Sequence, residues 1–288
     1  MVSCMTGGYG NAKSINRKLA EICEELQIAM GVGSQRQALE DSSYHETFRI
    51  VREAAPSIPL VGNLGAAEVA RLTDVSPVER LVEMIHADAF AVHLNPLQEF
   101  LQPEGNPDFR GVLKGIKLLT SRLSVPVIVK EIGAGISTSV AQRLVDAGVR
   151  IIDVAGAGGT SWAGIEMMRW SNNGSAKEKA AAAEASFWDW GIPTAESIRQ
   201  VASVKSRLPS LVVIASGGVS NGMDVAKSLA LGADLAAAAR PVLQTLHRGG
   251  VSALRNLIVR WKRELRGVMF LVGARNVARL QSVPLHRV

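Results

Sequence analysis

The stretch of sequence that decides the fold is AFAVHLNPLQE, residues 89–99. Its first four residues form a short apolar run of the kind that makes a fully buried strand. Pro96 then ends the strand, because proline cannot donate to a sheet ladder. An imidazole, two amides and a carboxylate follow the run at once. Polar side chains cost free energy when buried without partners, so this cluster is either a satisfied polar turn or a functional site.

Seven further apolar runs end in the same way, in glycine or polar residues. The eight predicted strands are residues 2–5, 28–32, 59–62, 89–92, 126–129, 151–154, 211–215 and 233–238. Helical periodicity lies between them; Leu19, Ile22, Cys23 and Leu26, for example, share one helix face. Strands that alternate with helices predict a parallel sheet, and eight such units predict one (β/α)8 TIM barrel over residues 1–288. An open doubly wound sheet is the alternative, although its glycine-rich fingerprint does not fit after the first strand.

Two irregularities stand out in this barrel pattern. The first run is so short that the first strand looks truncated at its N-terminus. The sixth and seventh strands are separated by more chain than one crossover helix needs, which predicts an insertion at about residues 159–194 of this single domain. The insertion contains a charged, alanine-rich helical run at 177–185 and the aromatic cluster FWDW at 187–190. Insertions of this length usually act as lids or partner contacts.

Composition excludes several classes of protein. The net charge is +6, but lysine and arginine are spread along the chain without the basic cluster of a nucleic-acid-binding protein. No apolar run approaches about 18 residues, so neither a membrane span nor a signal peptide is predicted. Cys4 and Cys23 are too few for a disulfide framework and lack metal-ligand spacing. We therefore expect a protein of the reducing cytoplasm.

Polar residues follow each predicted strand, and the carboxyl ends of barrel strands form the active site. We therefore expect a single site at this rim. The loops SGGVS (216–220) and AARP (238–241) follow the last two strands, where barrels commonly bind phosphate through backbone N–H groups and a helix N-terminus. Two tight turns are the alternative. Lys130 either snorkels outward or points its charge at an electron-rich ligand, such as a reduced flavin.

Two further rim residues have chemistry suited to a diphosphate. Arg36 can grip phosphate oxygens bidentately, unless it simply pairs with a local carboxylate such as Glu40. Glu99 is a single carboxylate, which suffices for Mg²⁺ only where substrate phosphates supply the other ligands.

These motifs closely resemble the type 2 isopentenyl-diphosphate delta-isomerase family. The matching stretches run through the whole chain in order: MTGG (5–8), MGVGSQR (30–36), NLG (63–65), HLNPLQE (93–99), VKEIGAGIS (129–137), DVAGAGGTSW (153–162), FWDWGIPT (187–194) and ASGGVSNGMDVAKSLALGA (215–233). The resemblance implies isomerisation of isopentenyl diphosphate to dimethylallyl diphosphate by reduced FMN, with flavin-mediated proton transfer. It also implies NAD(P)H as the reductant, Mg²⁺ on the diphosphate, and a homotetramer or homo-octamer.

The resemblance also assigns roles to individual residues. FMN contacts are implied for Met5, Thr6, Gly7, Ser34, Asn63, Lys130 and Thr160, and a phosphate cradle for Gly217, Gly218, Val219, Ala238 and Ala239. Substrate contacts are implied for Ser34, Gln35, Arg36, Asn95 and Gln98. Gln98 would lie beside the reacting carbons as the catalytic residue, and Glu99 would bind Mg²⁺.

The chain departs from the family pattern in two places. Ala155 stands where many relatives have serine, which would remove a flavin hydrogen bond worth roughly 1 kcal/mol. Nothing in the sequence corresponds to the N-terminal substrate segment of relatives, which carries an Arg-Lys pair and a histidine. A flavin-binding barrel without catalysis is therefore one alternative. An FMN oxidoreductase of the 2-hydroxyacid oxidase type is another, but it needs a histidine base, and only His93 follows a predicted strand.

Overall fold

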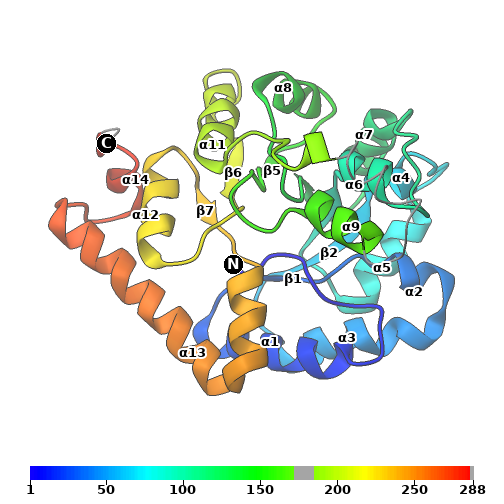
Figure 1. The fold of residues 1–288 in the computed structure, drawn as a ribbon, viewed down its shortest axis with the longest axis horizontal. Coiled ribbons are helices and arrows are strands. Elements are labelled where there is room, and N and C mark those ends of the chain that lie inside the picture. The colour runs from blue at the N-terminus through cyan, green and yellow to red at the C-terminus, as the bar shows by residue number, and fades with distance from the viewer. Residues whose placement is uncertain (172–184, 286–288) are drawn as a thin grey trace.

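The computed structural model describes residues 1–171 and 185–285. Seven parallel strands curl round a common axis in chain order (Figure 1). They are β1 (Met30–Gly31), β2 (Leu60–Gly65), β3 (Ala89–His93), β4 (Val127–Lys130), β5 (Ile151–Asp153), β6 (Val212–Ala215) and β7 (Leu235–Ala236). Each lies at a predicted strand, and the parallel order confirms the barrel over the open sheet, which would need the strand order to reverse.

The ring is closed by a single residue at the start of the chain. Val2 forms parallel bridges to Met30 of β1 and to Ala238 just after β7. Its N–H donates to Ala29 O at 2.9 Å, and its carbonyl accepts from Gly31 N–H at 2.9 Å. Figure 1 shows this end of the chain lying between β1 and β7. The predicted first strand, residues 2–5, is thus one bridge residue long.

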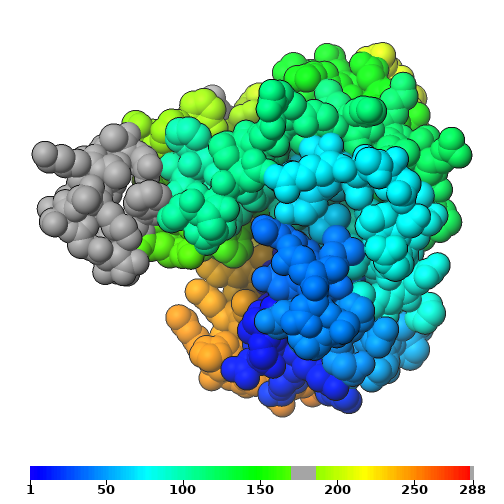
Figure 2. Space-filling view, turned by 90° about the vertical axis from the view of Figure 1, so that its right-hand side faces the viewer, coloured from blue at the N-terminus to red at the C-terminus, as the bar shows by residue number. Residues whose placement is uncertain are grey.

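Most helices surround the strands on the outside of the barrel, and two of them pack together at its carboxyl mouth. They are α1 (Ala12–Leu26), α2 (Arg36–Glu40), α3 (His45–Ala54), α4 (Ala66–Val69), α5 (Ser76–Ile85), α6 (Pro96–Leu101), α7 (Val112–Arg122), α8 (Thr138–Asp146), α9 (Trp162–Ser171), α11 (Thr194–Ser203), α12 (Gly222–Ala230), α13 (Arg240–Leu271) and α14 (Val277–Leu280). Side chains of the first helices, blue to cyan in Figure 2, form the outer wall on that face. The predicted helical run at 177–185 lies outside the described residues, apart from Ala185.

The strands pack two separate cores because successive side chains point to opposite faces. Small and branched residues fill the barrel interior, among them Ala89, Ala91 and Ile128. Phe90 and Val92, which alternate with them, point outward into the larger core under the helices. The same alternation carries the last residue of β3, β4 and β5 inward at the carboxyl mouth of the barrel. The alternation of inward and outward side chains therefore places these three residues together at the mouth of the barrel.

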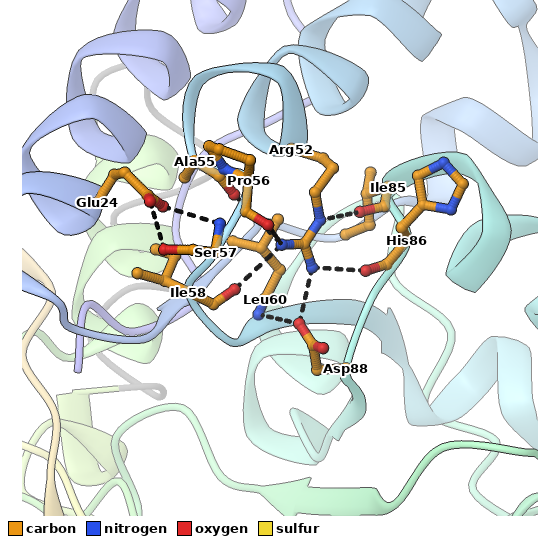
Figure 3. Close-up of polar contacts among 10 residues, drawn as sticks. All are labelled: Glu24, Arg52, Ala55, Pro56, Ser57, Ile58, Leu60, Ile85, His86 and Asp88. Atoms are coloured by element: carbon orange, nitrogen blue, oxygen red, sulfur yellow. Dashed lines mark hydrogen bonds and ion pairs between the residues drawn. The ribbon is translucent and has the colours of Figure 1, made fainter.

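Two local features shape the outside of the barrel. At the amino end of the strands, the Arg52 guanidinium donates to the carbonyl oxygens of residues 55, 56, 58, 85 and 86 (Figure 3). It also pairs with Asp88 at 2.7 Å, and Asp88 accepts from Leu60 N–H, so α3, α5 and β2 are tied together. Elsewhere, Gly250 breaks α13 with φ 70°, and the two arms of α13 diverge in Figure 1.

No helix in the described ranges is long and apolar enough to cross a membrane.

Candidate functional site at the barrel mouth

Two adjoining cavities open at the carboxyl ends of the strands. One, of about 290 Å³, lies over β4 to β7 and the start of α13, and the other, of about 270 Å³, lies over β1 to β3. Both are lined by Cys4, Lys130, Ile132 and Trp162, so they form two ends of one cleft. The site is therefore assembled from segments that lie at most of the strand ends, as the rim pattern predicted.

The first cavity ends in a cradle of backbone N–H groups. Gly217 and Gly218 adopt φ values of 101° and 81°, and a Cβ on either would lie 2.2 or 2.4 Å from a carbonyl oxygen of the β5 loop. Ala239 caps α13 without a side-chain hydrogen bond. Within the described residues, no hydrogen bond uses the N–H groups of Gly217, Gly218, Ala239 or Arg240. Free N–H groups at a glycine turn and a helix N-terminus suit a phosphate.

Other predicted cofactor residues divide into those that face the cleft and those that do not. Thr160, Val219 and Ala238 line the first cavity, and Met5 lines the second. The Thr6 hydroxyl instead donates to Asn16 Oδ1 in the protein wall. Gly7 has Phe48 packed where a Cβ would stand. Neither residue lines either cavity, and the Thr6 carbonyl already accepts from Gly33 N–H and from Asn16 Nδ2.

Lys130 places a buried ammonium at the centre of the cleft. Its side chain is 6% exposed, and Nζ donates to Glu131 O at 2.5 Å. It makes no ion pair within 4.0 Å among the described residues. The Glu131 carboxylate accepts from the N–H groups of Ile132, Gly133 and Ala134, which fixes the loop beside the ammonium.

Asp153 is a buried carboxyl that sequence reasoning missed. It ends β5, is 2% exposed, and its Oδ1 accepts from Ser216 Oγ at 2.6 Å and from Ala155 N–H at 3.3 Å. Burial raises the pKa of this carboxyl, while the charge of Lys130 and the two hydrogen bonds act to lower it. Ala155 adopts φ 35°, a left-handed conformation that residues with a Cβ rarely take. The only available signal was an acidic residue inside an apolar strand.

His93 is held neutral by its surroundings. Burial, with the nearby charge of Lys130, lowers the pKa of His93 to about 3. Its Nδ1 lies 3.0 Å from Asn63 Oδ1, and Asn63 Nδ2 donates to Val32 O, which fixes the amide. The proton therefore sits on Nδ1, leaving Nε2 as an acceptor. So low a pKa makes His93 a poor general base near neutral pH.

The second cavity gathers the amides and carboxylates of the decisive stretch. Asn95 Nδ2 donates to Glu99 Oε1 at 2.8 Å, while Asn95 Oδ1 is buried without a partner among the described residues. Glu99 Oε2 accepts from Asn106 N–H at 2.7 Å. Gln98 Oε1 accepts from Asn95 at 3.4 Å, and Gln98 Nε2 donates to Glu166 Oε1 at 3.2 Å. This connected network orients both ends of the Gln98 amide.

Glu166 is the second residue that sequence reasoning missed. It lies in α9 with a side chain 3% exposed, and its Oε2 pairs with Arg169 at 2.6 Å. The position follows the GGTSW motif by four residues, so one helical turn carries it back beside that motif. No periodicity marks a buried glutamate in a helix, and only its contact with Gln98 reveals it.

The three predicted diphosphate residues take different orientations. Ser34 and Arg36 line the second cavity. Arg36 uses only its Nε in ion pairs, at 3.2 Å to Glu40 and 3.5 Å to Glu68, so the rest of its fork is available. Gln35 is fully buried, where its amide accepts from Asn63 N–H and donates to Leu81 O. Its side chain is part of the wall.

The chain is similar to known proteins over most of its length. Residues 89–287 match the family model of the FMN-dependent dehydrogenases. The chain is 49% identical to an isopentenyl-diphosphate delta-isomerase of Chlorobaculum parvum, over 100% of this chain and 81% of the relative. It is 46% identical to the enzyme of that name from Cronobacter sakazakii, over 100% and 80% of the two chains.

Solved structures share the fold at low sequence identity. A lactate oxidase of Pediococcus acidilactici, described as putative, superposes with a TM-score of 0.65 at 19% identity, over 98% of this chain and 74% of the other. A mandelate oxidase with a monooxide FMN adduct gives 0.63 at 17% identity, over 97% and 77%. At these identities the likeness shows the barrel fold alone.

Proposed function

Because this chain belongs to the FMN-dependent, type 2 family of isopentenyl-diphosphate delta-isomerases, we propose that it converts isopentenyl diphosphate to dimethylallyl diphosphate. The observation that carries the proposal is the two-ended cleft. A free backbone cradle lies at one end, the Asn95, Gln98 and Glu99 network lies at the other, and a buried ammonium lies between them. This arrangement suits a flavin phosphate and a separate diphosphate substrate.

The chain has groups that fit FMN along the first cavity. The N–H groups of Gly217, Gly218 and Ala239 would hold the phosphate, because nothing else in the described chain uses them. Lys130, which lines both cavities, and Asn63, which lines the second, would meet the polar edge of the ring, while Thr160 and Val219 line the first cavity. When reduced and bound, the flavin supplies proton transfer at the substrate, and a cation beside it favours its anionic form. We propose NAD(P)H as the reductant.

The second cavity fits the diphosphate and its metal. Ser34 and the free part of the Arg36 fork would contact phosphate oxygens. Each oxygen of the Glu99 carboxylate accepts one N–H, so each keeps further acceptor capacity for Mg²⁺. The Gln35 side chain is left out of this proposal, because its amide is used inside the wall. Trp162, which lines both cavities, offers an apolar surface to the hydrocarbon end.

Gln98 is the catalytic residue that we propose, placed beside the reacting carbons. The reaction adds one proton at the terminal carbon of the double bond and removes one from the carbon nearer the diphosphate, so the formula is unchanged. Glu166 and Asn95 fix which end of the Gln98 amide faces the cleft. Arg169 pairs with the other oxygen of Glu166 at 2.6 Å and so holds this carboxylate behind the amide.

We also propose a homo-oligomer, either a tetramer or an octamer, and a cytoplasmic location. The family supports the first, and the two free cysteines, Cys4 and Cys23, are compatible with the second.

The test is product formation in D₂O. The holoprotein with reduced FMN, Mg²⁺ and isopentenyl diphosphate should yield deuterated dimethylallyl diphosphate by NMR. Glu99→Ala should lose the Mg²⁺-dependent activity and keep FMN, whereas Glu21→Ala, an exposed carboxylate on α1, should match the wild type. Wild-type protein that binds FMN but forms no product would refute the isomerase. Steady flavin reduction by 2-hydroxy acids would favour an oxidase instead.

A further inference from the structure

The buried carboxyl of Asp153 has no role in the functions described above. It lies directly below the cleft, and both residues that donate to its Oδ1, Ser216 and Ala155, line the first cavity. It forms no ion pair within 4.0 Å among the described residues. A carboxyl buried at the base of a ligand cleft needs a reason, because burial alone is unfavourable.

Lys130 is the complementary charge. Lys130 and Asp153 are register partners on the neighbouring strands β4 and β5, so their side chains leave the sheet on the same inner face. Both are nearly fully buried, at 6% and 2% exposed. The Nζ of Lys130 is bound by a backbone carbonyl, and Asp153 by a hydroxyl and an N–H. The two charges therefore face each other across one strand spacing without direct contact.

Burial raises the pKa of Asp153, and the hydrogen bonds to its Oδ1 act against that rise because they favour the charged form. Ser216 Oγ and Ala155 N–H both donate to Oδ1, and donors aimed at a carboxyl stabilise the anion. A buried ammonium at the next register position acts in the same direction. Burying an ammonium and a carboxylate as register partners is less unfavourable than burying either charge alone.

We propose that the ionised Asp153 is a tuning residue, whose negative charge partly offsets Lys130 and thereby sets the reduction potential of the bound flavin. The inference rests on the proposed FMN site. Lys130 lines the cleft and attracts an anionic reduced flavin, while Asp153, its register partner, lines neither cavity and opposes that attraction. Without Asp153 the full charge of Lys130 would act on the flavin.

The test is Asp153→Asn, which keeps an Oδ1 acceptor for Ser216 and Ala155 but removes the charge. The ratio of the FMN dissociation constants, oxidised over reduced, should rise about tenfold. For a two-electron couple this is a rise of about 30 mV in the midpoint potential. An unchanged or lowered potential would overturn the proposal.

Ser216→Ala is the matched control, because it removes one donor to the carboxylate while Ala155 N–H and the charge of Lys130 still stabilise the anion. Its dissociation-constant ratio should change by less than about threefold, equivalent to about 15 mV. If Asp153 were merely structural, both variants would weaken the two redox forms of FMN equally. That result would contradict tuning by charge.

A measurement on the wild type keeps the proposal testable should Asp153→Asn fail to fold. Infrared spectra of holoprotein labelled with ¹³C-aspartate should contain no protonated carboxyl band that shifts when FMN is reduced. Such a band would show a neutral Asp153 and refute the proposal. The dissociation constants and the infrared spectra need bound FMN but no isopentenyl diphosphate, so their outcome is independent of the isomerase reaction. A wild-type protein without affinity for FMN would refute the FMN site itself.

Discussion

Replacing Gly217 by alanine should damage the phosphate cradle and the fold together. The added Cβ would lie 2.2 Å from Gly156 O and 2.7 Å from Thr194 Oγ1. Ordinary contact begins at about 3.4 Å, so the β6 and β5 loops must move apart by at least about 1.2 Å. Gly217 also has φ 101°, where alanine is strained.

The expected magnitude follows from these two causes. The left-handed backbone costs about 1–2 kcal/mol, and overpacking against a backbone oxygen costs about 1–3 kcal/mol. We expect Gly217→Ala to lose about 2–5 kcal/mol in the free energy of unfolding. One displaced hydrogen bond to a charged phosphate is worth about 1.5–3 kcal/mol, so FMN should bind roughly 10- to 100-fold more weakly.

Denaturant unfolding and fluorescence titration with FMN would measure the two quantities. Gly10→Ala is the matched control, because no atom lies within 4 Å of its added Cβ and its φ is not positive. It should change the free energy of unfolding by less than about 0.5 kcal/mol. If Gly217→Ala bound FMN within threefold of the wild type and unfolded at the same denaturant concentration, the interlocked loops would not form the cradle.

Two further predictions concern stability. The pKa of His93 is about 3 in the fold, against an unfolded value of 6.5, so only the unfolded state gains this proton as the pH falls below 6.5. The free energy of unfolding should therefore drop by about 2 kcal/mol from pH 7 to pH 5 on account of His93. Denaturant titrations at several pH values should show that His93→Gln lacks this part of the pH dependence. An equal pH dependence in the two proteins would show a normally titrating histidine. Arg52→Ala leaves five carbonyl oxygens and Asp88 without their cation. It should lower the free energy of unfolding by about 2–3 kcal/mol, because these hydrogen bonds are only partly buried, against less than about 0.5 kcal/mol for the exposed Arg49→Ala on the same helix. FMN affinity of the folded protein should be unchanged, and a large affinity loss would mean that the two ends of the barrel are coupled.

The barrel and the family were predictable from sequence because their signals are local. A buried parallel strand is a short apolar run, and each run here ends in glycine or polar residues. Both features lie in adjacent residues of the sequence. The glycines at 217 and 218 predicted a phosphate loop. The structure adds a second reason for glycine at both positions, because a Cβ on either residue would collide with the loop after β5.

Only the tertiary structure decided which polar residues face the cleft. Gln35 and Thr6 lie in the predicted motifs, yet their side chains are held by Asn63, Leu81 and Asn16 from other segments. Hydrogen-bond partners that are distant in sequence determine these orientations, and no local pattern records them.

Asp153 and Glu166 are the opposite case, because both lie beside the cleft and neither was predicted from the sequence. Asp153 was hidden inside an apolar strand, and Glu166 inside a helix, and each became visible through one contact, with Ser216 and Gln98 respectively. The sequence by itself determined the alternation of strands and helices, because the periodicity of apolar residues is a local property of each segment. The register between strands determined that Lys130 and Asp153 share the base of the cleft, because register depends on how the closed sheet aligns segments far apart in the chain.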